Sequence, residues 1–365
     1  MRLGVESALV RGEFVRGDVE VRDGLVAAVG LAPPGVRGRI AVPGFVDLQV
    51  NGAGGVDFLA TAADYAQAGA ALLATGVTAY QPTLVTAPEA ALVAALRALP
   101  AEGGPGPRVL GAHLEGPFLA PERPGAHPPE HLRAPDLALL ERLLDAGRVT
   151  QMTLAPELSG AAGLIARLRA RGVVVSAGHT NATAAEAHTA FDLGVSAVTH
   201  VFNAMRPLGS RDPGVVGASL TRPGIVVTAI VDGRHLADET VRLVWRCAAG
   251  RLALVSDAVA VSGTGAFRLG ARELEALEGH VPALADGTLA GSTLTMIDAV
   301  RNLHGLGIPF ADAVGAATTV PARLLGRVGI GVLEPGGPAD AVVLDDRLEI
   351  VAVMRAGVAA VAARG

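Results

Sequence analysis

The hydrophobic positions in the middle of this chain form short, continuous apolar stretches that recur at regular intervals. Each stretch has the length of a buried strand, and continuous rather than alternating apolarity is typical of a parallel sheet that is covered on both faces. The predicted strands are Phe45–Val50, Val77–Leu84, Val109–Leu114, Val149–Leu154, Val173–Ala177, Ala197–Thr199, Ile225–Val231 and Leu252–Val255.

Segments rich in Ala, Leu and Arg, with helical periodicity, separate most of these strands. Eight strands that alternate with helices predict parallel pairing through right-handed crossovers. The strand number and the span of about 210 residues favour an α/β fold, a (β/α)8 TIM-like barrel, with a doubly wound open sheet as the alternative. The predicted helices lie in Ala62–Ala74, Pro88–Leu99, Asp136–Ala146, Gly160–Arg171, Ala182–Leu193 and Asp238–Ala249.

Both ends of the chain have a different pattern from the middle. Up to about residue 40, Val residues lie among closely spaced glycines, which is typical of short antiparallel strands and tight turns. Two similar apolar runs, 341–345 and 350–354, lie near the C-terminus. We therefore expect residues 1–44 and 331–365 to combine into one small β domain, and residues 45–330 to form the barrel.

The composition excludes several chemistries. All 30 basic residues are Arg, so a Schiff-base mechanism and a Lys-containing phosphate loop are both impossible. Residues 289–294 do not supply the Gly-x-Ser-x-Gly turn of a serine hydrolase. A net charge of −5 without a basic run argues against a nucleic-acid partner.

The single cysteine, Cys247, rules out an internal disulfide and a cysteine-based metal cluster. The sequence shows no convincing signal peptide and no convincing membrane span. We therefore expect a cytoplasmic protein without a membrane partner.

Polar side chains gather where the predicted strands end. In a barrel these ends meet on one face, which is where the chemistry takes place. Any one of these residues alone could be a cap, a turn residue or a surface group. Their joint recurrence at six strand ends favours a site. The residues are Gln49 and Asn51 on the first strand, Glu115 on the third, His179 on the fifth, His200 on the sixth, His235 past the seventh and Asp257 on the eighth.

Two His and one Glu offer the nitrogen and oxygen ligands of a catalytic metal site that keeps one position open for water. Zn²⁺ fits this ligand set, and Fe²⁺ or Mn²⁺ would accept similar ligands. A nearby carboxylate such as Asp257 can take a proton from the water and pass it to the leaving group. These residues predict metal-assisted hydrolysis of an unreactive bond, such as an amide.

Six motifs carry a family resemblance: Pro43–Gly52, His113–Phe118, Ala177–Thr180, Thr199–Met205, Asp232–His235 and Val255–Ala258. Together they resemble the N-acetylglucosamine-6-phosphate deacetylases of the amidohydrolase superfamily, from about residue 40 to the end of the chain. The resemblance implies a (β/α)8 barrel with a small β-sandwich built from both chain ends. It also implies an amino-sugar phosphate as substrate, with glucosamine 6-phosphate and acetate as products.

The same resemblance implies roles for individual residues. Glu115, His179 and His200 would hold one divalent metal ion. Asp257 would act as general base and then general acid, and His127 would contact the sugar and help to polarise the acetyl carbonyl. A neighbouring subunit supplies some phosphate contacts in this family, which implies a homodimer. The further substrate contacts would be Ala126, Asn203, Ala204, Arg211, Asp232, Gly233, Arg234, His235, Leu289, Ala290 and Gly291, with Asn203, Ala204, Arg211 and His235 around the phosphate.

One feature departs from the wider superfamily. Gln49 and Asn51 stand where many amidohydrolases place two His ligands of a second metal. Neutral amides are weaker ligands than imidazole, so we expect one tightly bound metal per subunit. Two alternatives remain open. One is an amidohydrolase for another N-acyl substrate, such as N-acetylgalactosamine 6-phosphate, and the other is an inactive barrel kept for binding or assembly.

Overall fold

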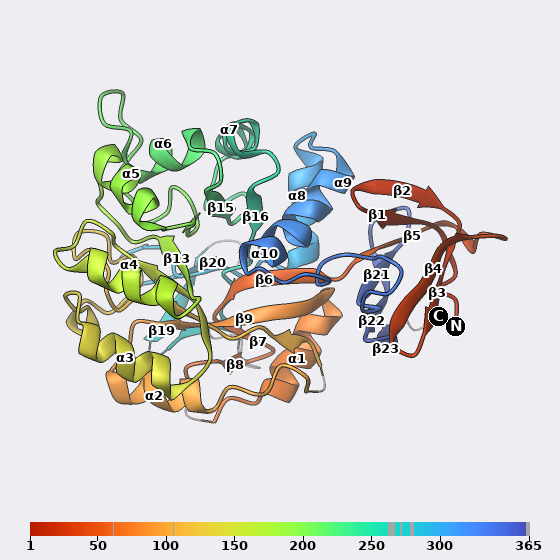
Figure 1. Cartoon of the computed structure of the whole chain (residues 1–365), viewed down its shortest axis with the longest axis horizontal. Coiled ribbons are helices and arrows are strands. Elements are labelled where there is room, and N and C mark those ends of the chain that lie inside the picture. The colour runs from red at the N-terminus through yellow and green to blue at the C-terminus, as the bar shows by residue number, and fades with distance from the viewer. Residues whose placement is uncertain (61, 105, 262–266, 271, 278–280, 363–365) are drawn as a thin grey trace.

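The middle of the chain forms a barrel of eight parallel strands ringed by helices, as the sequence predicts (Figure 1). The computed structural model describes residues 1–60, 62–104, 106–261, 267–270, 272–277 and 281–362. Each strand pairs in parallel with the next strand along the chain. The barrel strands are β6 (Phe45–Val50), β9 (Val77–Val85), β11 (Ala112–Glu115), β12 (Val149–Leu154), β13 (Val174–Ala177), β14 (Ala197–Val198), β15 (Val226–Ala229) and β16 (Leu252–Leu254).

The barrel closes where the end of β6 meets the segment that follows β16. The backbone N–H of Asp257 donates to the backbone carbonyl of Gln49 at 2.8 Å, and the backbone N–H of Asn51 donates to the backbone carbonyl of Ala258 at 2.7 Å. These bonds exclude the open doubly wound sheet, because they join the two ends of a row of strands that pair in chain order, whereas the two outer strands of an open sheet do not meet.

Helices cover the outside of the barrel, and several of them have a polar side chain that caps the N-terminus. Asp64 and Asp136 accept backbone N–H groups at two helix starts, and Thr183 forms a reciprocal capping box with Glu186. In the described part of the chain, no helix is apolar over enough residues to cross a bilayer. The helices are α1 (Tyr65–Ala74), α2 (Glu89–Arg97), α3 (Leu137–Ala146), α4 (Ala161–Ala170), α5 (Ala184–Leu193), α6 (Gly214–Thr221), α7 (Asp238–Ala248), α8 (Met296–Gly305), α9 (Phe310–Ala317) and α10 (Thr319–Leu324).

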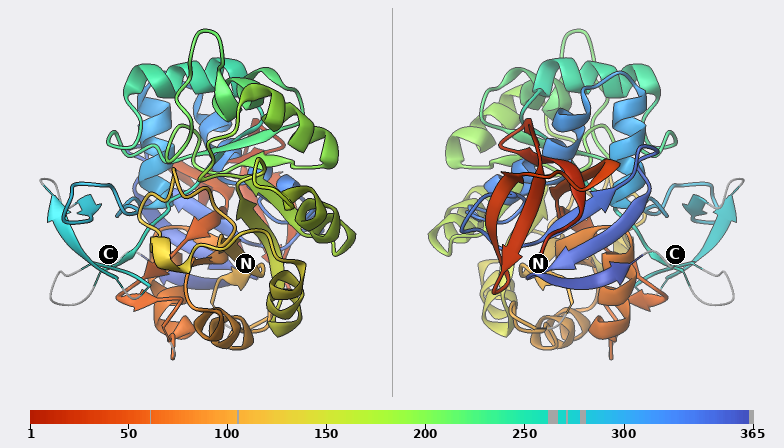
Figure 2. Two further views of the ribbon diagram at one scale, coloured as in Figure 1. Left: turned by 90° about the vertical axis from the view of Figure 1, so that its left-hand side faces the viewer. Right: turned by 90° about the vertical axis from the view of Figure 1, so that its right-hand side faces the viewer.

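The two chain ends build one small β domain, also as predicted. Figure 2 shows the red and blue strands of the two ends side by side. Six strands form one sheet in the order β2-β1-β5-β21-β22-β23, and the β3–β4 hairpin contributes Val19, Val21 and Val26 to the same hydrophobic core. The expectation of purely antiparallel strands is wrong at one place, because β1 pairs with β5 in parallel. The strands are β1 (Val5–Val10), β2 (Glu13–Arg16), β3 (Asp18–Arg22), β4 (Leu25–Leu31), β5 (Val36–Pro43), β21 (Ala341–Leu344), β22 (Ile350–Arg355) and β23 (Val358–Ala362).

Two other features differ from the sequence-based expectation. The predicted strand Val109–Leu114 is interrupted: β10 (Arg108–Val109) pairs with β9, Gly111 adopts φ +106°, and β11 starts at Ala112. A small antiparallel sheet was not predicted, because its short strands lack a continuous apolar run. It projects from one flank of the barrel (Figure 2) and consists of β17 (Ala260–Val261), β18 (Phe267–Leu269), β19 (Arg272–Leu277) and β20 (Val281–Ala283).

A chain of buried polar side chains ties five neighbouring barrel strands together one layer below Glu115. His113 Nε2 lies 2.7 Å from Thr153 Oγ1, and His113 Nδ1 lies 3.3 Å from Thr83 Oγ1. Thr199 Oγ1 lies 2.7 Å from Thr153 Oγ1 and 2.6 Å from Ser176 Oγ. Burial lowers the pKa of His113 to about 4, so the imidazole is neutral at pH 7. These hydrogen bonds hold the adjacent strands in position relative to one another, directly below the strand ends that carry the site residues.

Candidate active site

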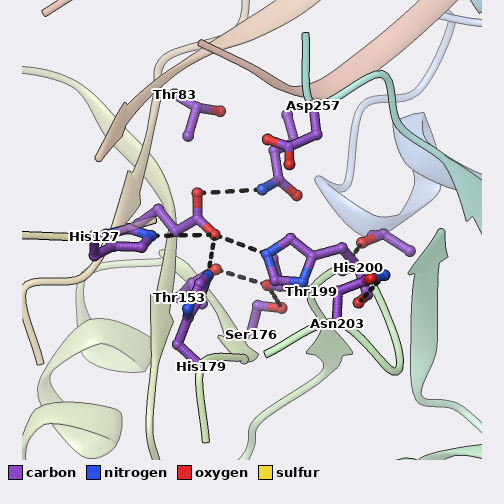
Figure 3. Close-up of polar contacts among 12 residues, drawn as sticks. Thr83, His127, Thr153, Ser176, His179, Thr199, His200, Asn203 and Asp257 are labelled. Carbon is purple, nitrogen blue, oxygen red and sulfur yellow. Dashed lines mark hydrogen bonds and ion pairs between the residues drawn. The ribbon is translucent and has the colours of Figure 1, made fainter. Parts of the chain in front are cut away.

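Three strand ends bring Glu115, His179 and His200 into contact. Figure 3 labels the two histidines, which lie around the same site as His127 and Asp257. Glu115 closes β11, whereas each histidine follows its strand by two residues. Glu115 Oε1 lies 3.0 Å from His179 Nε2 and 2.9 Å from His200 Nε2. All three side chains are buried, and one ligand atom from each lies within 4.8 Å of the others. The structure therefore brings these three side chains together, and their role as metal ligands stays a prediction.

The backbone turns sharply at three residues of the site. His179, His200 and Asp257 have φ values of +48°, +31° and +49°, a region that residues other than glycine rarely adopt. Such conformations cost on the order of 1–3 kcal/mol each and concentrate at functional sites, where the surrounding structure fixes them. In this chain, the turns begin directly after the parallel strands and direct the side chains toward one another.

The hydrogen bonds of His179 test whether a metal ion fits. Its Nδ1 lies 3.0 Å from the carbonyl oxygen of Arg123, which can only accept, so Nδ1 carries a proton. Burial, reinforced by the neighbouring His127, lowers the pKa of His179 to about 4, so the ring is neutral and Nε2 has a lone pair. That lone pair faces the Glu115 carboxylate. Two acceptors in contact require a cation between them, so the residues fit a divalent metal.

The charge of Glu115 completes this argument. Its burial opposes ionisation, but polar contacts with the neighbouring imidazoles, His127 first, outweigh burial and hold its pKa well below the usual value. The carboxylate is therefore anionic, as a metal ligand must be.

Gln49 and Asn51 turn their amide groups toward the acidic residues of the site. Gln49 Nε2 donates to Glu115 Oε2 at 3.2 Å, and Asn51 Nδ2 donates to Asp257 Oδ1 at 2.8 Å. Both side chains thus act as hydrogen-bond donors to the acidic residues. Amides bind metals through the carbonyl oxygen, and neither carbonyl oxygen takes part in these two bonds, so the expectation of a single metal stays a prediction.

Asp257 has the electrostatic environment of a proton-transfer group. Burial, and next the negative charge of Glu115, raise its pKa to about 6. The positive character of His200 and His235 and the hydrogen bond from Asn51 oppose that rise. A carboxyl group with a pKa near the working pH can both accept and return a proton.

His127 has the orientation of a hydrogen-bond donor toward the site. The backbone N–H of Thr86 donates to His127 Nδ1 at 3.3 Å, and the Thr86 hydroxyl lies 2.9 Å from the same nitrogen. Because Nδ1 accepts, a neutral ring carries its proton on Nε2. Nε2 lies 3.8 Å from Glu115 Oε1 and faces the centre of the site.

A cavity of about 320 Å³ opens above these residues. Several predicted contacts line it, and so do residues that the sequence reasoning passed over, notably Arg123, Ile230 and Leu269. Only the position of Arg123 in the sequence could have indicated its place in the lining. It lies between Glu115, a predicted metal ligand, and His127, a predicted substrate contact. The predicted residues in the lining are Asn51, Glu115, Ala126, His127, His179, His200, Asn203, Ala204, His235, Asp257, Leu289 and Gly291.

Other predicted contacts lie outside this lining. Arg211 is exposed on the loop between β14 and α6, and Gly233 and Arg234 are exposed past β15. Ala290 is fully buried in a hydrophobic cluster with Leu269 and does not reach the cavity surface. The structure of one subunit therefore does not place these residues at the site.

Asp232 acts on the cavity through His235. Asp232 Oδ2 lies 2.7 Å from His235 Nδ1, and Asp232 Oδ1 accepts the backbone N–H groups of Arg234 and His235 at 2.8 Å each. Burial raises the pKa of Asp232, but these bonds and the charge of His235 outweigh it and lower the pKa overall. The carboxylate fixes the imidazole, which lines the cavity itself.

Fold and site together define an amidohydrolase-type barrel. The model of the amidohydrolase family matches residues 40–360, and the chain belongs to this family. An N-acetylgalactosamine-6-phosphate deacetylase from Escherichia coli O157:H7 is 38% identical over 345 residues, which are 91% of each chain. The N-acetylglucosamine-6-phosphate deacetylase from Homo sapiens is 40% identical over 341 residues, 88% of this chain and 83% of the human protein.

Solved structures agree with this relationship. The chain is similar to a mutant N-acetyl-D-glucosamine-6-phosphate deacetylase from Mycobacterium smegmatis in complex with N-acetyl-D-glucosamine-6-phosphate, with a TM-score of 0.91, 37% identity and 99% of both chains covered. It is also similar to the N-acetylglucosamine-6-phosphate deacetylase from Thermotoga maritima, with a TM-score of 0.92, 31% identity and complete coverage of both chains.

Proposed function

We propose that the protein hydrolyses the acetamide of N-acetyl-D-glucosamine 6-phosphate to D-glucosamine 6-phosphate and acetate. The observation that carries this proposal is the convergence of Glu115, His179, His200 and Asp257 on one cavity. The similarity of the whole chain to deacetylases of this sugar phosphate supports it.

Glu115, His179 and His200 would hold one divalent metal ion per subunit, and we propose Zn²⁺, with Fe²⁺ or Mn²⁺ as alternatives. A bound ion of this kind acidifies a water molecule and polarises a carbonyl group. The protein residues fix the geometry for that chemistry, because Arg123 orients His179 and Gln49 orients Glu115.

The proton transfers are assigned to Asp257. Its ionised form would take a proton from the attacking water and then deliver it to the amine that leaves. The Asn51 amide engages Asp257 Oδ1, which fixes the direction of the carboxylate. The Nε2–H of His127 would donate to the acetyl oxygen as negative charge develops on it, and its contact with Thr86 supports this orientation.

The phosphate group requires hydrogen-bond donors in the cavity lining. Asn203 and His235 line the cavity and would contribute. We propose that Arg211 reaches the phosphate of a neighbouring subunit in a homodimer, since it is exposed on its own subunit. Its planar guanidinium can bind two phosphate oxygens at once.

The test is turnover by metal-reconstituted protein on N-acetylglucosamine with and without the 6-phosphate. We expect turnover to be at least tenfold more efficient with the phosphate. Equal rates would contradict the phosphate-binding role. Absence of hydrolysis after reconstitution with zinc, iron or manganese would instead favour an inactive barrel.

N-acetylgalactosamine 6-phosphate is a second candidate substrate, because the E. coli relative is named for it. The two sugars differ only in the orientation of one hydroxyl group. Parallel measurement of kcat/KM for both sugar phosphates separates the two candidates. A cytoplasmic location stays a prediction from the sequence.

A further inference from the structure

Asp47 is a buried carboxyl group that has no direct place in the reaction. It lies on β6, is 0% exposed and has no ion-pair partner among the described residues. Its Oδ2 accepts the Ser256 hydroxyl at 2.5 Å, and its Oδ1 accepts the backbone N–H groups of Gln49 and Ser256 at 3.2 Å each. An unpaired buried carboxyl is costly, and burial raises the pKa of Asp47 to about 7.

Ser256 precedes Asp257 directly, and all its polar groups are engaged. Its hydroxyl and its amide both bind Asp47. Its carbonyl accepts the hydroxyl of Ser292 at 2.5 Å. The residue is therefore held from two sides, by β6 and by the segment that precedes α8.

The seam between β6 and the segment after β16 has little regular strand pairing. Among the described residues, its β-bridge is the isolated pair Val50–Ala258. Asp47 and Ser256 precede the two bridge residues, so their contacts lie next to that bridge, on its N-terminal side. They add a side-chain link at a seam that lacks the continuous backbone ladder of the other barrel strands.

We propose that Asp47 and Ser256 form a clasp that positions the catalytic Asp257 across this seam. Asp257 has a positive φ, and its backbone is bonded on both sides: its amide to the Gln49 carbonyl at 2.8 Å and its carbonyl to the Ser292 amide at 2.9 Å. A residue other than glycine does not favour a positive φ by itself, so the contacts around Asp257 must hold its backbone in this conformation. Asp47 and Ser256 are positioning residues, and the proposal rests on the proposed function of Asp257.

The size of the expected effect follows from the geometry. A misplacement of about 1 Å at a reacting group can cost on the order of 10²-fold in rate. Loss of the clasp should lower kcat, because the proton transfer depends on the direction of Asp257. The metal ligands come from other strands, and most of the predicted substrate contacts come from other loops, so metal content and KM should change little.

The first variant is Ser256→Ala, with Ser219→Ala as the matched control. Ser219 is also fully buried, and its hydroxyl donates to the Val216 carbonyl at 2.9 Å in α6, away from the cavity. We expect kcat per bound metal to fall at least tenfold in Ser256→Ala and less than twofold in Ser219→Ala, with KM unchanged within twofold. Equal kcat values for the two variants would overturn the clasp.

Asp47→Asn is the conservative variant. Its carboxamide oxygen can still accept the two N–H groups, and its NH₂ can donate to the Ser256 oxygen while that hydroxyl turns to the Gln49 carbonyl, 3.3 Å away. We expect kcat within threefold of the wild type, and a loss as large as in Ser256→Ala would contradict a geometric role. If Ser256→Ala does not fold, Ser292→Ala serves instead, because it releases the Ser256 carbonyl, and it should show the same fall in kcat.

Two further measurements separate the clasp from general destabilisation and from the proposed function. The pH profile of kcat should shift its acidic limb in Ser256→Ala, because Asp257 loses its fixed contact with Asn51, whereas a purely structural loss leaves the limb in place. A crystal structure of Ser256→Ala reports the Asn51–Asp257 distance without any turnover. An unchanged distance of 2.8 Å would overturn the clasp even if the wild type proves inactive on both sugar phosphates.

Discussion

Asn51 Nδ2 donates a hydrogen bond of 2.8 Å to Asp257 Oδ1 across the seam where the barrel closes. This bond stabilises the ionised form of Asp257 and therefore lowers its pKa against the effects of burial and of Glu115. The amide thus favours the state in which Asp257 can accept a proton from water.

Replacing Asn51 with Leu should therefore raise the pKa of Asp257. The base works only when ionised, so the acidic limb of the kcat profile should move to higher pH, and kcat at neutral pH should fall about tenfold. The measurement is kcat from pH 5 to pH 9 with saturating substrate. An acidic limb that stays in place in the Leu variant would show that Asn51 does not tune Asp257.

Asp257→Asn isolates the proton transfer. The carboxamide keeps the size of the side chain but cannot carry the proton, so we expect kcat to fall by about 10²–10⁴-fold. Metal content should stay at the wild-type level, because Asp257 is not among the three clustered ligands. Turnover near the wild-type rate, in protein shown by mass spectrometry to be free of deamidation, would remove Asp257 from the mechanism.

His200→Ala tests the metal ligands. Loss of one of three protein ligands should lower the bound metal per subunit well below the wild-type stoichiometry and should lower activity in parallel. Elemental analysis of protein purified without added metal measures this. His188→Ala is the control, since His188 is an exposed histidine on α5. Equal metal content in the two variants would contradict the proposed ligand set.

Arg211→Ala tests whether one subunit completes the site of the next. We expect KM for the sugar phosphate to rise by about 10–100-fold, the effect of losing a charged hydrogen bond, with little change for the sugar without phosphate. Arg246→Ala controls for the loss of an exposed positive charge, because Arg246 is exposed on α7 and is not among the predicted substrate contacts.

The subunit exchange experiment uses mixed dimers. Subunits that carry Arg211→Ala should be mixed with subunits that carry Asp257→Asn. Each variant alone should have little or no activity. If Arg211 acts on the partner's site, one composite site contains both an intact base and an intact Arg211, so activity should recover in part on mixing. No recovery in verified mixed dimers would place the action of Arg211 within its own subunit.

The sequence predicts the barrel well because its signal is local. Each strand is a short apolar run, and the residues at strand ends, such as Glu115 and His179, meet through topology alone. The sheet β17–β20 was missed because its strands are two to six residues long and carry charged residues such as Arg272 and Glu273. Strands of this kind gain their stability from tertiary contacts rather than from a local pattern.

The finer parts of the site depend on relationships that no local pattern contains. Gln49 and Asn51 are readily found as polar strand-end residues, but their roles as donors follow only from the positions of Glu115 and Asp257. Arg211 shows the opposite case. The family resemblance assigns Arg211 to the phosphate, whereas the structure leaves it exposed and outside the cavity lining, so its role stays a proposal.

The buried carboxyl of Asp47 should make the stability of the protein depend on pH. Its pKa is about 7 in the folded protein, compared with 3.8 in an exposed reference state. Between these values the folded protein holds a proton that the unfolded chain has released, so a rise in pH favours unfolding. Over this interval the contribution of Asp47 to the free energy of unfolding should fall by about 4 kcal/mol.

Asp47→Asn removes this dependence, because the carboxamide does not titrate. The difference in free energy of unfolding between Asp47→Asn and the wild type should therefore grow in favour of the variant as the pH rises from about 4 to about 7, and then remain level. Parallel chemical denaturation of both proteins measures it. Ser219→Ala adds no titratable change, so its difference from the wild type should stay constant with pH. A constant difference for Asp47→Asn as well would mean that Asp47 is ionised in the fold, stabilised by Ser256 and the two backbone N–H groups more strongly than burial destabilises it.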